Sequence, residues 1–179
     1  MNKASLLPLL LLLGTLVMMI VMAKTGASLK TKDTPLGIIN LELPFTKLKA
    51  DSVLNSWKIA TNTEGIVNTE VAKINTQWDF LFILFYSLFL FTAATKLSAN
   101  FNGGFGNAGK NLGKAAFIAA ALDIAENIGM FQMLDGNITD GIALFTSICS
   151  AIKWLLVIAI VLFMLLTAPL VWYNNIRNN

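Results

Sequence analysis

Four long apolar runs divide the chain, and each is long enough to cross a lipid bilayer as a helix. About 20 helical residues, at ~1.5 Å per residue, span a hydrocarbon layer of roughly 30 Å. The predicted membrane-spanning helices cover residues 5–23, 78–97, 115–134 and 144–172. The fourth run is longer than one crossing requires, so we expect it to tilt or to project from the membrane, with Pro169 marking its inner end.

The first run allows two interpretations. Lys3 precedes an apolar stretch that ends in a small residue, Ala23, and this arrangement is also typical of a cleaved secretory signal. Its length is nevertheless sufficient for one membrane crossing. We therefore favour a retained transmembrane helix over residues 5–23.

The segment 24–77 is polar enough to lie in solvent, because it contains seven lysines and five acids. Residues 36–43 partly alternate between apolar and polar positions before Pro44, which predicts a short extended stretch. Thr46 can cap a helix that runs to about Ile59. The apolar positions of this helix share one face: Ala50, Val53, Leu54 and Trp57.

Helical periodicity also extends upstream of the second run. Apolar positions from Ile66 to Trp78 repeat at helical spacing, so we expect that helix to begin outside the membrane, near Glu64. Together the patterns predict one all-α membrane domain over residues 1–179. Its architecture would be a four-helix transmembrane bundle with a small extracytoplasmic cap built from residues 24–77.

Glycine and asparagine dominate the connection between the second and third runs, residues 98–114, which predicts a flexible cytoplasmic loop. Residues 104–109 fit the pattern G-x-G-x-x-G, and Lys110 follows as in a phosphate-binding loop. Position 111, however, is Asn where Ser or Thr would hold magnesium, and an apolar run rather than a sheet strand precedes the glycines. We therefore expect neither a nucleotide nor a nucleic-acid partner, and expect the lysines of this loop to meet lipid headgroups.

Basic residues set the expected orientation. Lys3, Lys96 and Arg177 belong to segments that contain no acid, whereas the short connection 135–140 contains two acids and no base. Under the positive-inside rule, both termini and the 98–114 loop lie in the cytoplasm, and segment 24–77 lies outside. We expect this membrane to be a bacterial cytoplasmic membrane.

The composition agrees with a membrane protein and excludes several kinds of site. Of the 179 residues, 56% are hydrophobic and only 13% are charged, whereas a soluble domain carries roughly 25% charged residues. The chain contains no histidine and one cysteine, Cys149, so structural disulfides, Cys/His zinc sites and histidine proton relays are excluded. We expect no cofactor and no metal site.

The third run contains the most informative polar residues. Asp123, Glu126 and Asn127 stand at i, i+3 and i+4, so they project from one face of a helix. An acid near the middle of a membrane costs roughly 2.5–3.5 kcal/mol on insertion scales. Two such acids must therefore meet a partner, hold a proton or face water.

Residues outside this helix complete the candidate site. Lys153 is the expected cation, with Glu126 as its nearer partner and Asp123 as the more distant one. Asp79 and Tyr86 share a face of the second helix, and Glu42 of the outer segment can fold onto them. The predicted ligand-binding or charge cluster is Glu42, Asp79, Tyr86, Asp123, Glu126, Asn127 and Lys153, in the outer half of the bundle.

Several functions are compatible with such a cluster. The first is a non-catalytic membrane subunit or binding protein in a larger complex, whose acids hold a cation, a proton or a headgroup amine. The second is a transporter coupled to a proton or a small solute, and the third is an intramembrane enzyme acting on lipid. A purely structural role, in which the polar residues only fix helix pairing, is the alternative to all three. The expected partners are membrane lipid and other membrane subunits.

The set of motifs resembles a group of uncharacterised bacterial integral membrane proteins with four spans. The similarity rests on residues 37–42 (GIINLE), Trp57, the sequence from Asp79 to Tyr86, residues 123–127 (DIAEN) and Lys153. The resemblance implies four spans and groups the same polar residues. It implies no particular activity.

Overall fold

A computed structural model describes residues 3–177, and the prediction of an all-α chain is confirmed for them. Four helices are long: α1 (Lys3–Thr25), α4 (Asn68–Ser98), α5 (Gly103–Leu134) and α6 (Asp140–Arg177). The remaining helical elements are short: η1 (Ala27–Leu29), α2 (Ile39–Glu42) and α3 (Lys47–Lys58). Among the described residues, the four long helices are those whose length and apolar composition suffice to cross a membrane.

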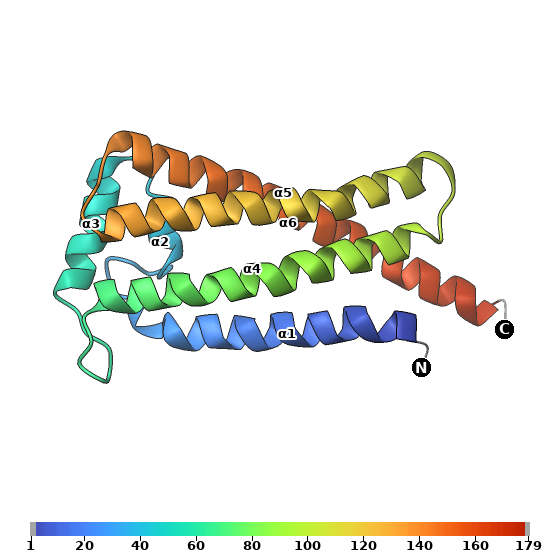
Figure 1. Ribbon diagram of the computed structural model, residues 1–179, viewed down its shortest axis with the longest axis horizontal. Helices are drawn as coiled ribbons and strands as arrows, with labels where there is room; N and C mark the ends of the chain where they lie inside the picture. The colour runs from blue at the N-terminus through green and yellow to red at the C-terminus, as the bar shows by residue number, and fades with distance from the viewer. Residues whose placement is uncertain (1–2, 178–179) are drawn as a thin grey trace.

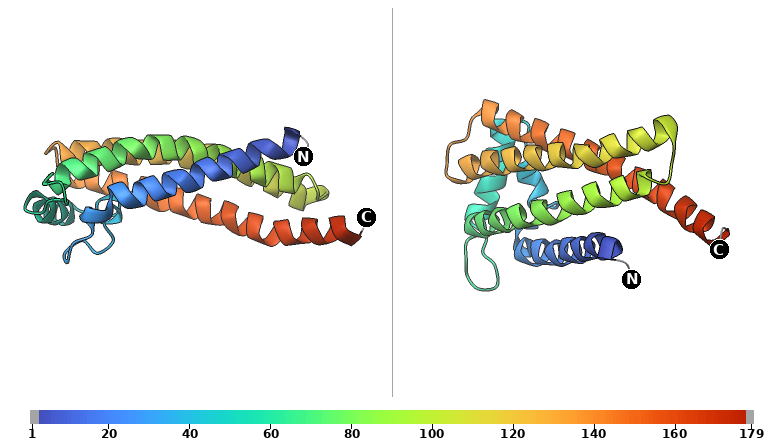
Figure 2. Two further views of the ribbon diagram at one scale, coloured as in Figure 1. Left: turned by 90° about the horizontal axis from the view of Figure 1, so that it is seen from below. Right: turned by 45° about the vertical axis from the view of Figure 1, so that its right-hand side comes forward.

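The long helices lie side by side in chain order. α1 packs on α4, α4 packs on α5, and α5 packs on α6. α6 crosses α4 and α5 obliquely, so that its C-terminal part diverges from them (Figures 1 and 2). The N-terminus, the C-terminus and the α4–α5 connection lie at one end of the molecule, and α3 lies across the other end (Figure 1).

The prediction of a flexible loop over residues 98–114 is wrong, because α5 already begins at Gly103. Three glycines of this stretch, Gly106, Gly109 and Gly113, are buried and face neighbouring backbone or side chains. A side chain at Gly109 would meet Phe163 of α6, and one at Gly113 would meet the Thr95 hydroxyl of α4. Close helix packing at small residues therefore stabilises a helix that glycine alone disfavours.

Two smaller predictions also differ from the structure. The stretch expected to be extended contains the one-turn helix α2, which ends at Glu42 before Pro44. Helix α6 does not end at Pro169 but continues to Arg177. Proline removes only one backbone N–H donor from the helix, and the residues after it keep theirs, so the helix continues past Pro169.

The expected helix after Thr46 is confirmed, and it covers an apolar core at the α3 end of the molecule. The Thr46 hydroxyl accepts a hydrogen bond from Lys49 N, as the capping pattern predicts. Trp57 is fully buried, and its indole N–H donates to Leu29 O at 3.0 Å. Side chains from several elements complete this core: Leu41, Ala50, Val53, Leu54, Val71, Met130, Met133 and Ala143.

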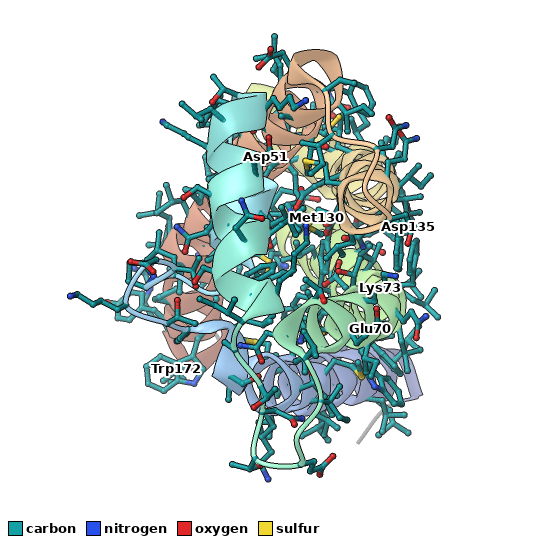
Figure 3. The ribbon with its side chains drawn as sticks, turned by 90° about the vertical axis from the view of Figure 1, so that its left-hand side faces the viewer. Asp51, Glu70, Lys73, Met130, Asp135 and Trp172 are labelled. Atoms are coloured by element: carbon teal, nitrogen blue, oxygen red, sulfur yellow. The ribbon has the colours of Figure 1, made fainter. Side chains whose placement is uncertain are left out.

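An exposed ion-pair group ties the ends of α4 and α5 together beside this core. Lys73 Nζ lies 3.3 Å from Glu70 Oε1 and 3.0 Å from Asp135 Oδ1 (Figure 3). Surface pairs of this kind contribute about 1 kcal/mol or less, so the buried apolar contacts hold the two helix ends together more than these charges do.

The helical start of α5 predicts opposite effects for two neighbouring glycines. A Cβ at Gly106 would collide with the backbone carbonyl of Phe101, so Gly106→Ala should lower the free energy of unfolding by about 1–3 kcal/mol. Gly104 has open space around it, and Gly104→Ala should be neutral or stabilising by up to about 1 kcal/mol. Thermal unfolding of both variants in detergent measures the difference. Equal unfolding temperatures would contradict a packed helix in this stretch.

Candidate functional site

Lys153 lies at the centre of a buried ionic cluster. Its Nζ atom is 2.7 Å from Glu126 Oε2, 2.8 Å from Asp123 Oδ1 and 3.8 Å from Glu42 Oε2. The four residues come from α2, α5 and α6, which are distant in sequence except for the pair on α5. One ammonium group is thus shared by three carboxyl groups.

Helix α4 contributes two further side chains, Asp79 and Tyr86, which are hydrogen-bonded to residues of α5. The Tyr86 hydroxyl donates a hydrogen bond to Asp123 Oδ2 at 2.8 Å. The Asn127 amide donates to Asp79 Oδ2 at 2.7 Å. These bonds bring all seven residues predicted from the sequence into one region, although the Asp79–Asn127 pair joins the Lys153 group only through the adjacent positions of Glu126 and Asn127.

The spacing along α5 explains this arrangement. Asp123 and Asn127 are one turn apart, and both are hydrogen-bonded to side chains of α4. Asp123 also contacts Lys153 of α6, as Glu126 does. Helix α5 packs on both α4 and α6. Its polar side chains therefore contact both neighbours instead of the molecule's outer surface.

Glu42 reaches the cluster because α2 and the residues that follow it lie against the first half of α6. Glu42 Oε2 accepts from the Ser150 hydroxyl at 3.4 Å and from the Trp154 indole at 3.5 Å. Beyond α2, the chain runs toward the start of α6, since Phe45 N donates to Ser147 Oγ and Lys47 N donates to Asp140 Oδ1, both at 2.8 Å.

The cluster is deeply buried and acidic. Glu126 and Asn127 are 0% exposed, Asp123 is 3% exposed and Lys153 is 6% exposed. Asp79 is only half-buried. Glu42, Asp79, Asp123 and Glu126 face one lysine, so the cluster carries a large formal excess of negative charge when all its groups are ionised. Separated from water, such an excess is costly unless additional positive charge is supplied.

Hydrogen-bond donors are unequally distributed among the acids. Asp123 accepts hydrogen bonds from both Tyr86 and Lys153. Glu126 Oε2 lies 2.7 Å from Lys153 Nζ, whereas Glu126 Oε1 has no hydrogen-bond partner among the described residues. The buried Oδ1 of Asn127 likewise has none within residues 3–177.

The structure corrects one expectation and adds residues that sequence reasoning missed. Asp123 was expected to be the more distant partner of Lys153, but it is as close as Glu126, because α5 presents both side chains toward α6. The sequence did not identify three residues of α6 that bind this part of the chain. Ser150 and Trp154 donate to Glu42, and Ser147 accepts from Phe45 N. A signal for two of them exists, since Ser147, Ser150 and Lys153 repeat every three residues along α6.

The chemistry available to the cluster is the binding of positive charge. In the part of the chain that the structure describes, no group of three or more His, Cys, Asp or Glu residues is arranged to hold a metal ion. Cys149 is buried in α6, and there is no histidine to activate it. The acids instead surround a lysine and leave buried acceptor oxygens without donors.

Comparison with known proteins adds no relative: no family model, no curated protein and no solved structure matches this chain.

Removing the central cation tests whether the cluster depends on it. Lys153→Met should lower the free energy of unfolding by about 3–5 kcal/mol, because it leaves buried carboxylates without a counter-charge. Lys110→Met, at an exposed position, is the control and should change stability by less than about 0.5 kcal/mol. Denaturation in detergent measures both variants.

A second variant checks the electrostatic cause. Adding Asp123→Asn to Lys153→Met should recover part of the loss, since it removes one of the uncompensated charges. An unfolding curve of Lys153→Met that matches the unmodified protein would show that the charges are balanced in some other way.

Proposed function

We propose that this chain is a multi-pass membrane protein that binds a positively charged group at an acidic site in the outer part of its transmembrane bundle. In this proposal α1, α4, α5 and α6 span the membrane, and residues 26–67 form a small extracytoplasmic cap over their outer ends. The protein is a non-catalytic binding protein or subunit that works in a larger membrane complex.

The contacts between α1 and α4 support the position of the outer membrane boundary. The Asn75 amide donates to Met22 O at 3.0 Å and to Thr25 Oγ1 at 2.7 Å, so the end of α1 is level with Asn75. Trp78 follows within one turn and is 44% exposed, as an interfacial tryptophan would be. Tyr86 then lies about 12 Å deeper, at ~1.5 Å per residue. The acidic site would extend from the outer boundary through the outer half of the bilayer.

The excess of acids over bases in this buried site is the observation on which the function rests. Lys153 can compensate one carboxylate fully, and three carboxyl groups lie within 4 Å of it. A lipid headgroup amine, a cationic side chain of another subunit or a proton would supply the missing charge. Structural helix pairing alone would require fewer charges, since neutral hydrogen bonds in membranes already stabilise helix contacts by ~0.6 kcal/mol on average.

Transport of a proton or small solute is the second candidate, and the inner half of the molecule favours it less. The buried polar side chains there include Ser98 and Thr167, and each donates to a carbonyl of its own helix. Such hydroxyls do not form a charged path toward the opposite end. An intramembrane enzyme is the least supported function, because the acids contact a lysine and a tyrosine and not an activated nucleophile.

Lipid and neighbouring subunits are the proposed partners, and the outward face of α4 fits both. Phe80, Leu81 and Leu84 are each more than one-third exposed in the isolated chain. These side chains would meet acyl chains or another protein. We also propose that the membrane is a bacterial cytoplasmic membrane, with both termini inside, and that the chain is related to the four-span proteins that its motifs resemble.

Labelling of single cysteines tests the proposed orientation. In a Cys149→Ser background, Asn55→Cys on α3 should react with a membrane-impermeant thiol reagent in intact cells, because Asn55 is exposed on the cap. Asn107→Cys, exposed near the start of α5, should react only after the membrane is permeabilised. The reverse pattern would contradict the proposed topology.

Purification in mild detergent tests the binding function. Native mass spectrometry of the unmodified protein should detect a retained amine-containing lipid or a second protein subunit. The double variant Asp123→Ala/Glu126→Gln should lose it while circular dichroism still shows a folded helical protein. Lys110→Met serves as the matched control and should retain it. Loss of the fold alone, with the bound species unchanged in every folded variant, would support a structural role for the acids.

A further inference from the structure

The face of α3 that points away from the bundle exposes two large apolar side chains. Ile59 is 88% exposed and Leu48 is 79% exposed, more than any other large hydrophobic side chain among the described residues. Lipid covers such side chains on the proposed spanning helices, but α3 belongs to the proposed cap, outside the bilayer. Single exposed apolar residues are common on protein surfaces, so the arrangement of the residues between these two decides whether they form a binding surface.

A continuous stripe of side chains joins Leu48 to Ile59 along α3. Four polar residues fall between them at helical spacing: Asp51, Ser52, Asn55 and Ser56. The stripe lies on the side of α3 opposite the buried Trp57. Together with Asp33 of the preceding segment, it lines an open groove of about 460 Å³. The groove thus has apolar ends and a polar, acidic centre.

We propose that this groove binds α3 of a second copy of the chain, with the two helices antiparallel about a two-fold axis. The stripe is complementary to itself in that arrangement, because its residues are placed symmetrically about its midpoint. Leu48 of one copy then lies level with Ile59 of the other. The polar residues pair in the same register: Asp51 with Ser56, and Ser52 with Asn55. Apolar ends meet apolar ends, and each polar side chain meets one that can hydrogen-bond to it.

Charged residues on one flank of the stripe favour the same pairing. Asp51 and Lys58 are separated by about 10 Å along their own helix, which is too far for an ion pair. In the antiparallel pair, Asp51 of one copy and Lys58 of the other are offset by only about 3 Å along the helix axes. Neither residue forms an ion pair within the part of the chain that the structure describes. A second copy therefore supplies each of them with its counter-charge.

The opposite flank carries a second complementary pair. The Thr31 hydroxyl lies 3.0 Å from the Ser56 hydroxyl, so the segment that contains Asp33 runs beside Ser56. Lys49 and Ser56 share this flank of α3. Antiparallel pairing brings Lys49 of the second copy next to that segment, offset by about 3 Å from Ser56 along the helix axes. Surface ion pairs are individually weak, so these charges select the antiparallel direction more than they supply affinity.

The position of α3 allows two copies in one membrane to meet in this way. Seen from the α3 end of the molecule, α3 lies beside the ends of α4 and α5 (Figure 3). The stripe then faces along the membrane plane in the proposed orientation. Two helices that lie in this plane and are related by a two-fold axis along the membrane normal run antiparallel.

The contact is small, and the membrane compensates for its size. One face of a 12-residue helix offers less than the roughly 800 Å² per partner of a standard stable interface. Confinement of both copies to one membrane raises their effective concentration, which such a contact needs. The inference rests on the proposed topology and does not depend on what binds at the acidic site.

Cysteine crosslinking in native membranes tests the pairing in a Cys149→Ser background. Asn55→Cys should form a disulfide-linked dimer on mild oxidation, because Asn55 lies close to the two-fold axis. Leu48→Cys and Ile59→Cys should each fail alone, since copies of the same residue are about 16 Å apart along the helix axes. Expressed together with different tags, these two variants should crosslink to each other. The proposal is overturned by the absence of a dimer in every combination, by a dimer of Leu48→Cys alone, or by a crosslink of Asn55→Cys only to another protein.

Charge reversal tests the register. In the Asn55→Cys protein, Asp51→Lys should lower the dimer fraction several-fold, and adding Lys58→Asp should restore it, because opposite charges again face each other across the pair. Glu64→Lys makes the same change in charge at the exposed turn before α4, and this control should keep the dimer. Circular dichroism checks the fold of each variant. Equal dimer fractions in Asp51→Lys and in the variant that also carries Lys58→Asp would refute the pairing.

The rate of thiol labelling gives a second measurement. Pairing should slow, without preventing, the reaction of Asn55→Cys with the membrane-impermeant reagent, so Asp51→Lys should speed this reaction in intact cells. An unchanged rate would show that the groove is not covered. Failure of the dimer would leave the proposed function intact, because none of these variants alters the acidic site.

Discussion

The sharing of one lysine ammonium group among several buried carboxyl groups is the constraint on which the arrangement of this protein depends. Lys153 lies within 4 Å of acids from two other helices, and the group is at most 9% exposed. Charges separated from water are tolerated only when they are paired and hydrogen-bonded. The positions of α2, α5 and α6 relative to one another are consequently linked through a single side chain.

This constraint also connects the outer segment to the long helices. Glu42 is held by Lys153, Ser150 and Trp154, and the chain that follows it is held by Ser147 and Asp140. The apolar core around Trp57 then forms where this segment meets the ends of α4, α5 and α6.

Local patterns predicted some elements accurately and others poorly. The cap residue Thr46 and the apolar face of α3 depend on neighbours within one or two turns, and both predictions are confirmed. Residues 103–113 were expected to be a loop because glycine disfavours helices in isolation. Their helical structure depends on Phe163 and Thr95, which lie far away in sequence and fill the space that the missing side chains leave.

The sequence by itself determined the positions of the four apolar runs, the absence of histidine and the common face of Asp123, Glu126 and Asn127. These properties follow from composition and from the fixed geometry of a helix, which places residues i, i+3 and i+4 together. Only the tertiary structure decided that Asp123 and Glu126 both contact Lys153 within 3 Å, and that Glu42 joins them at 3.8 Å. The reason is that the register between helices is set by packing over the whole contact surface, and no spacing within one helix contains that information.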